Sequence, residues 1–322
     1  MQKRTHFDVL VIGSACVDIV FSGMPHWPKL GHELYVSDFA LGAGSIFNTA
    51  ASLSRLGLRV GLLTELGNDF FSRFILDEID QFGISRDLII VHNHPMRSVS
   101  VCLAHEGERG FVSYADIYAG KATRLLDALS PSHHPDDHAA VRQILQSLAI
   151  YDFDAVFMYA QPHLHPLLDL FQARGVPIFF DTGWHPEGLD YSLLFDVIKR
   201  ANVIMPNFME ATSMTGTQTA EDAALTLANH LPIAIVKMGA QGVVACRQGQ
   251  LTYCPALPIK EVVDTTGAGD AFNAGFIYGT LKGYSFTDAL RCGTICGGLS
   301  TTALTGTAAV PTADELEQLR AQ

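Results

Sequence analysis

The sequence predicts an α/β protein with three layers, in which helices cover both faces of a mainly parallel central sheet and a small β-sheet forms a lid. Short apolar runs alternate with helix-like segments along most of the 322 residues. Because parallel neighbouring strands need a crossover between them, this alternation is typical of a parallel sheet. Two stretches of strand-like sequence break the alternation, and these predict the lid.

The predicted strands of the central sheet are short apolar runs, and the predicted helices lie between them. The first run, Phe7–Ile12, ends at Gly13, as expected of a buried parallel strand that leads into a loop. Gly57 and Gly83 follow the first two helix-like segments, at the position where a helix end favours glycine. Further strands are predicted over 59–64, 155–159, 176–180, 203–205 and 233–236, and helices over 45–56, 69–82, 164–174, 208–215, 219–230, 267–281, 286–302 and 312–321.

The lid is predicted from strand-like segments at 35–39, 98–104 and 110–114, with a hairpin turn at 106–108. No linker or internal repeat divides the chain. We therefore expect one domain over residues 1–322, with lid segments inserted at approximately 14–41 and 95–118. A sheet that projects over a ligand cleft can close on bound substrate and exclude water.

Composition and charge exclude several classes of protein. Hydrophobic residues make up 48% of the chain and charged residues 17%, which favours a folded core over disorder. A formal net charge of −12 repels nucleic acid and anionic membranes, so we expect neither as a partner. The chain shows no secretory signal and its six cysteines form no CxxC pair, which predicts reduced thiols and a cytoplasmic location.

The strongest chemical signal is the segment Asp264–Asn273, DTTGAGDAFN. It follows a β-branched run at 259–263, predicted as a strand, and it opens a helix. Backbone N–H groups of Gly267, Ala268 and Gly269 at a helix N-terminus predict an anion hole. A carboxylate beside such a hole is suited to accept a proton from an attacking hydroxyl, which is the role predicted for Asp270. The alternative is that Asp270 only stabilises the first turn of the helix.

The extended segment DTTGAGDAFNAGF resembles the C-terminal signature of the PfkB family, the ribokinase-like carbohydrate kinases, and the resemblance covers nearly the whole chain. It implies a kinase that uses Mg²⁺ and ATP to phosphorylate a hydroxyl of a small sugar, and we expect this hydroxyl to be a primary one. The family's sugar contacts fall on Asp18, in GSACVD, and on Gly44 and Asn48, in a glycine-rich loop. This loop departs from the family at Ala43, Ile46 and Phe47, where smaller residues are usual.

Two further segments resemble family elements around the nucleotide. Asn207 and Glu210 match an NxxE motif, which implies that Glu210 acts on Mg²⁺ through water with Asn207 in support. The turn after Val236 matches the nucleotide-lining strand and turn, and it implies contacts from Lys237, Gly239 and Gly242. Asp181 is a weaker candidate near the phosphates, because Gly183 stands where the family usually has Asn.

The resemblance also implies a monovalent cation, such as K⁺, bound at Asp264 and Thr266. It further implies a homodimer formed through the lid.

Arg97 precedes a lid strand and is a candidate to bind a phosphate or carboxylate of the substrate; the alternative is a surface arginine. The histidines at 133, 134 and 138 are assigned to a solvated polar loop, because no second group of metal ligands is placed beside them.

Two other functions stay open. A nucleoside kinase of the same fold would need an aromatic clamp for the base, for which Phe39, Phe47 and Tyr114 are candidates. A non-catalytic sugar-binding or regulatory protein is the second alternative, although the complete base, anion loop and NxxE motif argue against it. The sequence leaves open which sugar is the acceptor and which hydroxyl reacts.

Overall fold

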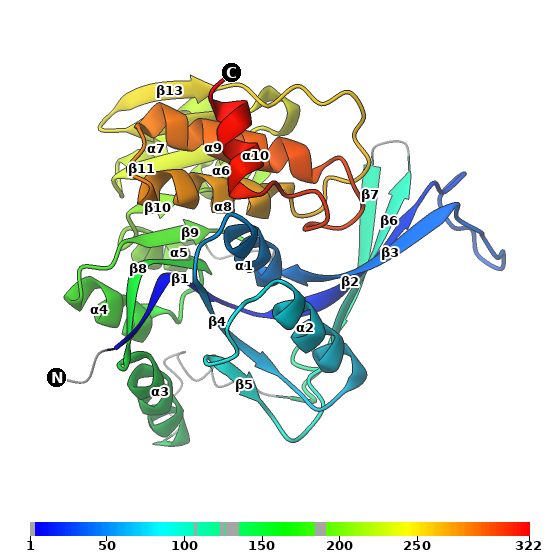
Figure 1. Cartoon of the computed structure of the whole chain (residues 1–322), viewed down its shortest axis with the longest axis horizontal. Coiled ribbons are helices and arrows are strands. Elements are labelled where there is room, and N and C mark those ends of the chain that lie inside the picture. The colour runs from blue at the N-terminus through cyan, green and yellow to red at the C-terminus, as the bar shows by residue number, and fades with distance from the viewer. Residues whose placement is uncertain (1–3, 106–107, 123–125, 127–134, 184–190) are drawn as a thin grey trace.

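A computed structural model describes residues 4–105, 108–122, 126, 135–183 and 191–322. Within these residues the chain forms two sheets, one of nine strands and one of four. Figure 1 shows the large sheet at the centre of the main body and the small sheet projecting from it. The predicted α/β architecture with a separate lid is confirmed.

The central sheet is mostly parallel, with strand order β13-β12-β11-β10-β9-β8-β1-β4-β5. β12 runs antiparallel to both of its neighbours, β11 and β13. The strands are β1 (Thr5–Ile12), β4 (Val60–Leu66), β5 (Ile89–Val91), β8 (Tyr151–Tyr159), β9 (Ile178–Asp181), β10 (Val203–Ile204), β11 (Ile233–Lys237), β12 (Val243–Arg247) and β13 (Gln250–Cys254).

Helices cover both faces of this sheet, because its strands are apolar on both sides. Along β1, Val9 and Val11 join one buried cluster and Leu10 and Ile12 join the other. The first cluster packs against α1 (Ile46–Arg55), α2 (Phe70–Gln81), α8 (Ala268–Leu281), α9 (Phe286–Ser300) and α10 (Ala313–Arg320). The second packs against α3 (Pro135–Leu148), α4 (His165–Ala173), α5 (Tyr191–Ile198), α6 (Phe208–Thr215) and α7 (Ala220–Ala228).

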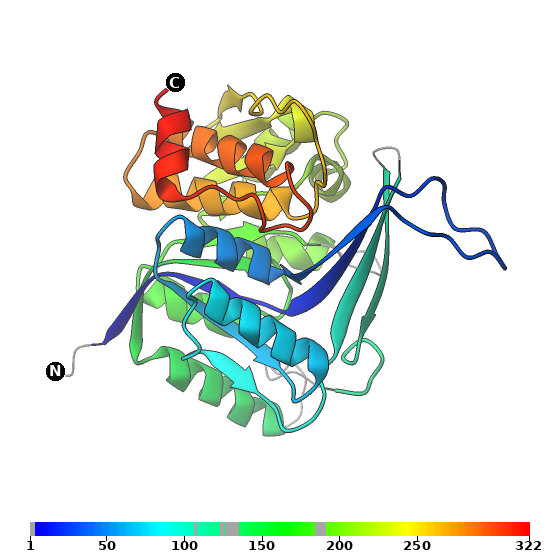
Figure 2. The ribbon, with the colours of Figure 1, turned by 45° about the vertical axis from the view of Figure 1, so that its right-hand side comes forward.

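The lid is a four-stranded sheet with the order β3-β2-β6-β7. Its strands are β2 (Ala15–Ser22), β3 (Asp38–Ser45), β6 (Ser98–His105) and β7 (Glu108–Ala115). In Figure 2 the lid stands along one side of the main body. The predicted hairpin residues 106–107 lie outside the described residues, as do residues 127–134 of the histidine-containing segment.

Several sequence predictions were wrong in detail. The run at 259–263 forms no strand. Val262 and Val263 are exposed, and no strand in the described part of the chain pairs with them. The glycines at 42 and 44 lie in strand β3 and not in a loop, because β3 pairs with β2 along its full length. The strand predicted at 35–39 begins later, at Asp38. It continues to Ser45, so the lid extends beyond residue 41.

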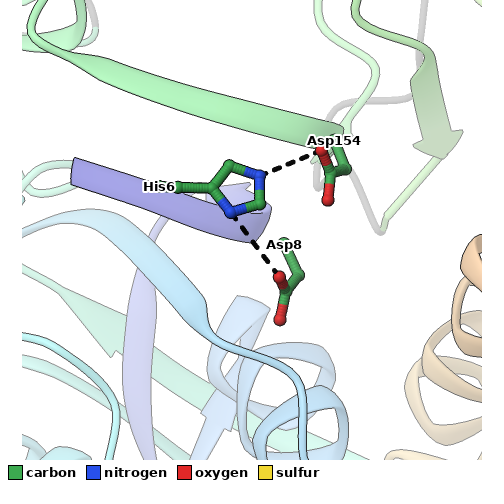
Figure 3. A group of neighbouring side chains, drawn as sticks. All are labelled: His6, Asp8 and Asp154. Atoms are coloured by element: carbon green, nitrogen blue, oxygen red, sulfur yellow. Dashed lines mark hydrogen bonds and ion pairs between the residues drawn. The ribbon is translucent and has the colours of Figure 1, made fainter. Parts of the chain in front are cut away.

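A polar cluster ties β1 to β8 at the amino edge of the central sheet. His6 Nε2 lies 2.9 Å from Asp154 Oδ1, and Asp8 flanks the other side of the ring (Figure 3). Arg59 donates to His6 Nδ1 at 2.7 Å, so this nitrogen is an acceptor and the Nε2–H donates to Asp154. Since Arg59 already uses the lone pair that a metal would need, the cluster is a clamp between strands.

No helix in the described part of the chain combines the length and the apolar character needed to cross a membrane.

Candidate active site

Four strands of the central sheet bring polar groups to its carboxyl edge. β8 ends at Tyr159, β9 at Asp181 and β11 at Lys237, while β10 leads into α6. Ligands of open α/β sheets bind at this edge, where the loops leave the strands. The N-terminus of α8 lies here too, since its Asp270 contacts Tyr159 at the end of β8.

The predicted anion loop has the geometry of a helix start. Gly267 is the N-cap of α8 and has φ +72°, a left-handed conformation that favours glycine. A Cβ on Gly267 would lie 2.5 Å from Gly306 Cα, so space also excludes a side chain. The first turn of a helix leaves N–H groups without helical partners. The Ala268 N–H lies 3.3 Å from the Thr265 carbonyl, so Gly267 and Gly269 are the stronger candidates to hold an anion.

Three donors converge on the Asp270 carboxylate. Tyr159 Oη donates to Oδ1 at 3.0 Å and Thr49 Oγ1 donates to the same oxygen at 3.2 Å. Asn48 Nδ2 donates to Oδ2 at 3.3 Å. The structure therefore brings together two predicted residues, Asn48 and Asp270, with two that the sequence did not single out.

The pKa of Asp270 is raised to about 6, first by burial and then by the charge of Asp181. Lys237 and the hydrogen bonds from Tyr159 and Asn48 oppose this rise. A carboxylate with a pKa of about 6 is ionised at neutral pH and is a stronger base than an ordinary aspartate. This value suits a residue that takes a proton from a hydroxyl.

Lys237 links the anion loop to the carboxyl edge. Its Nζ donates to Asp181 Oδ2 at 2.6 Å and to Asn273 Oδ1 at 3.3 Å. Asn273 Nδ2 also donates to Asp181 Oδ2, at 2.6 Å. A Cβ on Gly269 would lie 3.1 Å from Lys237 Nζ, so the ammonium group is next to the loop. This places a positive charge beside the predicted anion hole.

The NxxE motif forms a capping box at the start of α6. Asn207 Oδ1 accepts from the Glu210 N–H at 2.9 Å, and Glu210 Oε2 accepts from the Asn207 N–H at 2.8 Å. Thr182 Oγ1 donates to the same Glu210 oxygen at 2.6 Å. Burial, and then the charge of Asp181, raise the pKa of Glu210.

A hollow of about 510 Å³ lies beside this motif, within the usual size range of small-molecule sites. Three of the predicted nucleotide contacts, Asn207, Lys237 and Gly239, line it. Gly242 is not in the lining. A Cβ there would overlap the Cys254 carbonyl, so Gly242 allows β13 to pass close by. Apolar walls come from Phe208, Met209, Ala220 and Met238.

The lid contributes Asp18 to the site. Cys102 Sγ lies 3.9 Å from Thr266 Oγ1, which shows that the face of the lid carrying Cys102 looks toward the anion loop. By register, one row across this face is Gly42, Asp18, Ser100 and Ser113. Burial, with a smaller contribution from Asp264, raises the pKa of Asp18 to about 6. A Cβ on Gly44 would overlap the Asp18 carboxylate, so this carboxylate lies against bare backbone.

Asn48 is buried at the start of α1, and its Oδ1 has no hydrogen-bond partner among the described residues. This oxygen faces Gly306, where a Cβ would lie 2.6 Å from it. A buried acceptor without a donor is costly, so the position calls for a ligand hydroxyl or a water. The finding fits the predicted contact between Asn48 and a sugar.

Arg109, which the sequence analysis missed, extends from lid strand β7 to the segment before the anion loop. Its Nη1 donates to Thr266 Oγ1 at 3.3 Å and lies 3.9 Å from Asp264 Oδ1. Asp264 also accepts from the backbone N–H groups of Thr266 and Thr305. The predicted cation ligands thus already face a guanidinium group.

The Arg97 guanidinium pairs with Asp116, which is not among the predicted site residues. This guanidinium forms two hydrogen bonds with Asp116, at 2.8 and 3.0 Å, and this pairing lowers the pKa of Asp116.

The predicted aromatic clamp does not assemble. Phe47 is fully buried in the core, and Phe39 and Tyr114 occupy lid positions that alternate with those facing the anion loop.

Sequence reasoning overlooked Tyr159 and Arg109, which lie far from the motifs along the chain. It also overlooked Thr49 and Thr182, although each directly follows a candidate residue, Asn48 and Asp181. Tyr159 carried a signal of its own. It is the last residue of an apolar run, and polar residues that end parallel strands meet at one edge of the sheet.

Comparisons with known proteins identify the family and the fold. Residues 7–313 match the family described as pfkB family carbohydrate kinase. The 2-dehydro-3-deoxygluconokinase of Bacillus subtilis (strain 168) is 29% identical over 303 residues, which cover 88% of each chain. The structure of Arabidopsis thaliana ribokinase complexed with ribose and ATP has a TM-score of 0.75 at 22% identity, covering 98% of this chain and 99% of that one. A nucleoside kinase from Burkholderia thailandensis, in complex with inosine, has a TM-score of 0.74 at 20% identity over 97% of both chains.

Proposed function

Because the chain belongs to the pfkB family of carbohydrate kinases, we propose that it transfers the γ-phosphoryl group of ATP to a hydroxyl, preferably a primary one, of a small sugar. The observation that carries this proposal is the buried Asp270 carboxylate at the N-terminus of α8, held beside Gly267 and Gly269. Since the donor is ATP, we place the reaction in the cytoplasm.

The acceptor hydroxyl attacks the γ-phosphorus while Asp270 takes its proton. The bond between the acceptor oxygen and phosphorus forms, and the bond from phosphorus to the β,γ-bridging oxygen breaks to release ADP. The N–H groups of the loop and the Lys237 ammonium face the charge on the transferring group. The phosphates enter from the 510 Å³ hollow, whose lining includes Lys237 and whose apolar walls suit adenine.

The oxygen donors at the carboxyl edge fit Mg²⁺, which prefers carboxylates and retained waters. Glu210 is the residue we expect to hold the ion through water, with Thr182 and Asn207 fixing its carboxylate. Bound Mg²⁺ would neutralise charge on the phosphates. A monovalent cation at Asp264 and Thr266 fits less well, because Arg109 already places a positive charge there.

We propose that the acceptor lies between the body and the lid row that contains Asp18. Asp18, Ser100 and Ser113 offer oxygens for sugar hydroxyls, and Asn48 offers the buried Oδ1 without a partner. A nucleoside acceptor is less well supported, because the expected aromatic clamp does not assemble. The similarity to a 2-dehydro-3-deoxygluconokinase makes a sugar acid a prime candidate to test.

We further propose that the protein is a homodimer joined through its lid. Strands β3 and β7 have free edges within the lid sheet. By register, the row Leu41, Ile19, Val101 and Val112 crosses the face turned away from the anion loop. Leu41 and Val112 are exposed, so this apolar face would be covered by a second copy.

The experiment is an ADP-release assay with Mg·ATP against sugars, 2-dehydro-3-deoxygluconate, sugar phosphates and nucleosides. Each positive acceptor is repeated with Asp270→Asn. We expect turnover with one class of acceptor and a loss of at least about a hundredfold in kcat without the base, while acceptor binding persists. Calorimetric binding of a sugar without turnover by the native protein would instead support a sugar-binding protein.

A further inference from the structure

We propose that Tyr159 is a positioning residue for the base: its hydroxyl holds Oδ1 of Asp270, so that Oδ2 is the oxygen that takes the acceptor's proton. The inference rests on the proposed function only in naming Asp270 as the base. It adds a role for a residue outside every motif in the sequence, and it distinguishes the two oxygens of one carboxylate.

The two oxygens of Asp270 accept different numbers of hydrogen bonds. Oδ1 accepts from two hydroxyls, Tyr159 at 3.0 Å and Thr49 at 3.2 Å. Oδ2 accepts from Asn48 Nδ2 alone among the described residues, at 3.3 Å. A carboxylate oxygen offers about two lone-pair positions. Oδ1 is therefore saturated, and the free lone pair that a base needs is on Oδ2.

The Tyr159 ring is fixed by its surroundings. It stands at the end of β8, where Tyr159 is in register with Asp181 of β9. One side of the ring lies against Gly183, where a Cβ would be 3.1 Å from Tyr159 Cγ, and Gly183 has φ +64°. Phe157 contacts the ring edge to face, with centroids 6.1 Å apart. A ring held by backbone and core can fix its hydroxyl, and through it the carboxylate.

The Tyr159 hydroxyl is a donor and not a second base. Burial, and then the charges of Asp270 and Asp181, raise its pKa well above the usual range, so it keeps its proton. The other charged or titratable groups that influence Asp270 or Tyr159 here are Lys237 and Cys16. A hydrogen bond to the ionised form favours ionisation, so Tyr159 keeps the base more acidic than burial alone would.

The test is Tyr159→Phe, which removes the hydroxyl and keeps the ring. The protein is labelled with ¹³C at aspartate carboxyls, the Asp270 signal is assigned by its loss in Asp270→Asn, and its titration is followed in the native protein and the variant. A lost hydrogen bond to a charged group corresponds to a rise of about one pH unit in the midpoint. The acid limb of the kcat profile should move upward by the same amount.

Tyr284→Phe is the matched control, because Tyr284 Oη donates to the Glu317 carboxylate at 2.6 Å in another part of the molecule. It should leave the Asp270 titration unchanged. Thr49→Val, which removes the second donor to Oδ1, should move the midpoint in the same direction as Tyr159→Phe. An unchanged midpoint in folded Tyr159→Phe would overturn the inference. Absence of turnover in the native protein would count against the proposed function alone, since the carboxyl titration needs no substrate.

Discussion

At the scale of single residues, the site contains two carboxyl groups whose ionised form is destabilised by folding. The pKa values of Asp18 and Asp270 rise from 3.8 to about 6, mainly through burial. Between pH 3.8 and about pH 6, the folded protein therefore binds more protons than the unfolded chain. Stability therefore falls as pH rises through this window, and the full cost is present above about pH 6. Such a cost is common where function needs a charge in a buried place.

Asp270→Asn should remove the free-energy cost of keeping an ionised carboxylate buried at this position. The variant should therefore gain thermal stability relative to the native protein as pH rises. The difference in Tm should grow between pH 4.5 and about pH 6.5 and stay constant above it, reaching a few degrees. Thermal unfolding of both proteins across this range measures the difference. Parallel curves at all pH values would contradict a raised pKa for Asp270.

At the scale of elements, the glycine-rich segment acts as a strand. Pairing of β3 with β2 brings Gly44 opposite Cys16, and the Asp18 carboxylate lies over the Gly44 backbone. The segment therefore leaves space for the Asp18 carboxylate, because Gly44 carries no side chain. The departures at Ala43, Ile46 and Phe47 do not enter this space, since all three are buried in the core on the body side.

Gly44→Ala should displace Asp18 and raise the KM for the acceptor about tenfold or more, while the KM for ATP stays unchanged. Steady-state kinetics with the two substrates varied in turn provide the measurement. Gly42→Ala is the milder control, because the nearest atoms to its Cβ would be those of the Thr305 side chain, at 3.1 Å or more. Equal effects of the two substitutions would show that Asp18 does not set acceptor affinity.

Prediction from sequence succeeded where a local pattern decides the structure. Helix α6 has the predicted bounds, since Asn207 and Glu210 cap it and Gly216 ends it in a left-handed conformation. Prediction failed at 259–263, because β-branched residues favour a strand only if a partner strand lies beside them. The start of helix α8, with Asp270 in its first turn, was predicted from its motif. Arg109 could not be found, because only the folded chain brings β7 to the segment before α8. For Tyr159 the sequence offered only its place at the end of a predicted strand.

At the scale of the whole molecule, the lid presents two unlike faces. Asp18, Ser100 and Ser113 turn toward the body, whereas Leu41 and Val112 turn outward. A four-stranded sheet with one apolar face uncovered favours association, and a lid–lid dimer would cover this face in both copies. Assembly would then hold each lid at a set angle to its own site.

Val112→Asp should convert the dimer to a monomer, because it places a charge on the apolar face. Sedimentation velocity over a range of concentrations would show the change in mass. Val91→Asp is the matched control, since Val91 is a similarly exposed valine on β5 in the main body. A native protein that sediments as a monomer would rule out the proposed assembly.

The pairing of β2 with β6 also links acceptor binding to folding. It places Asp18 beside Ser100 although the chain between them forms α1, β4 and α2 of the main body. Pairing segments this far apart in the sequence carries a loop-closure entropy cost. The lid should accordingly open more readily than the body, and its amide hydrogens should exchange with solvent first. A bound acceptor that contacts both partners would slow this exchange, so deuterium uptake at β2 and β6 could report binding before any product is formed.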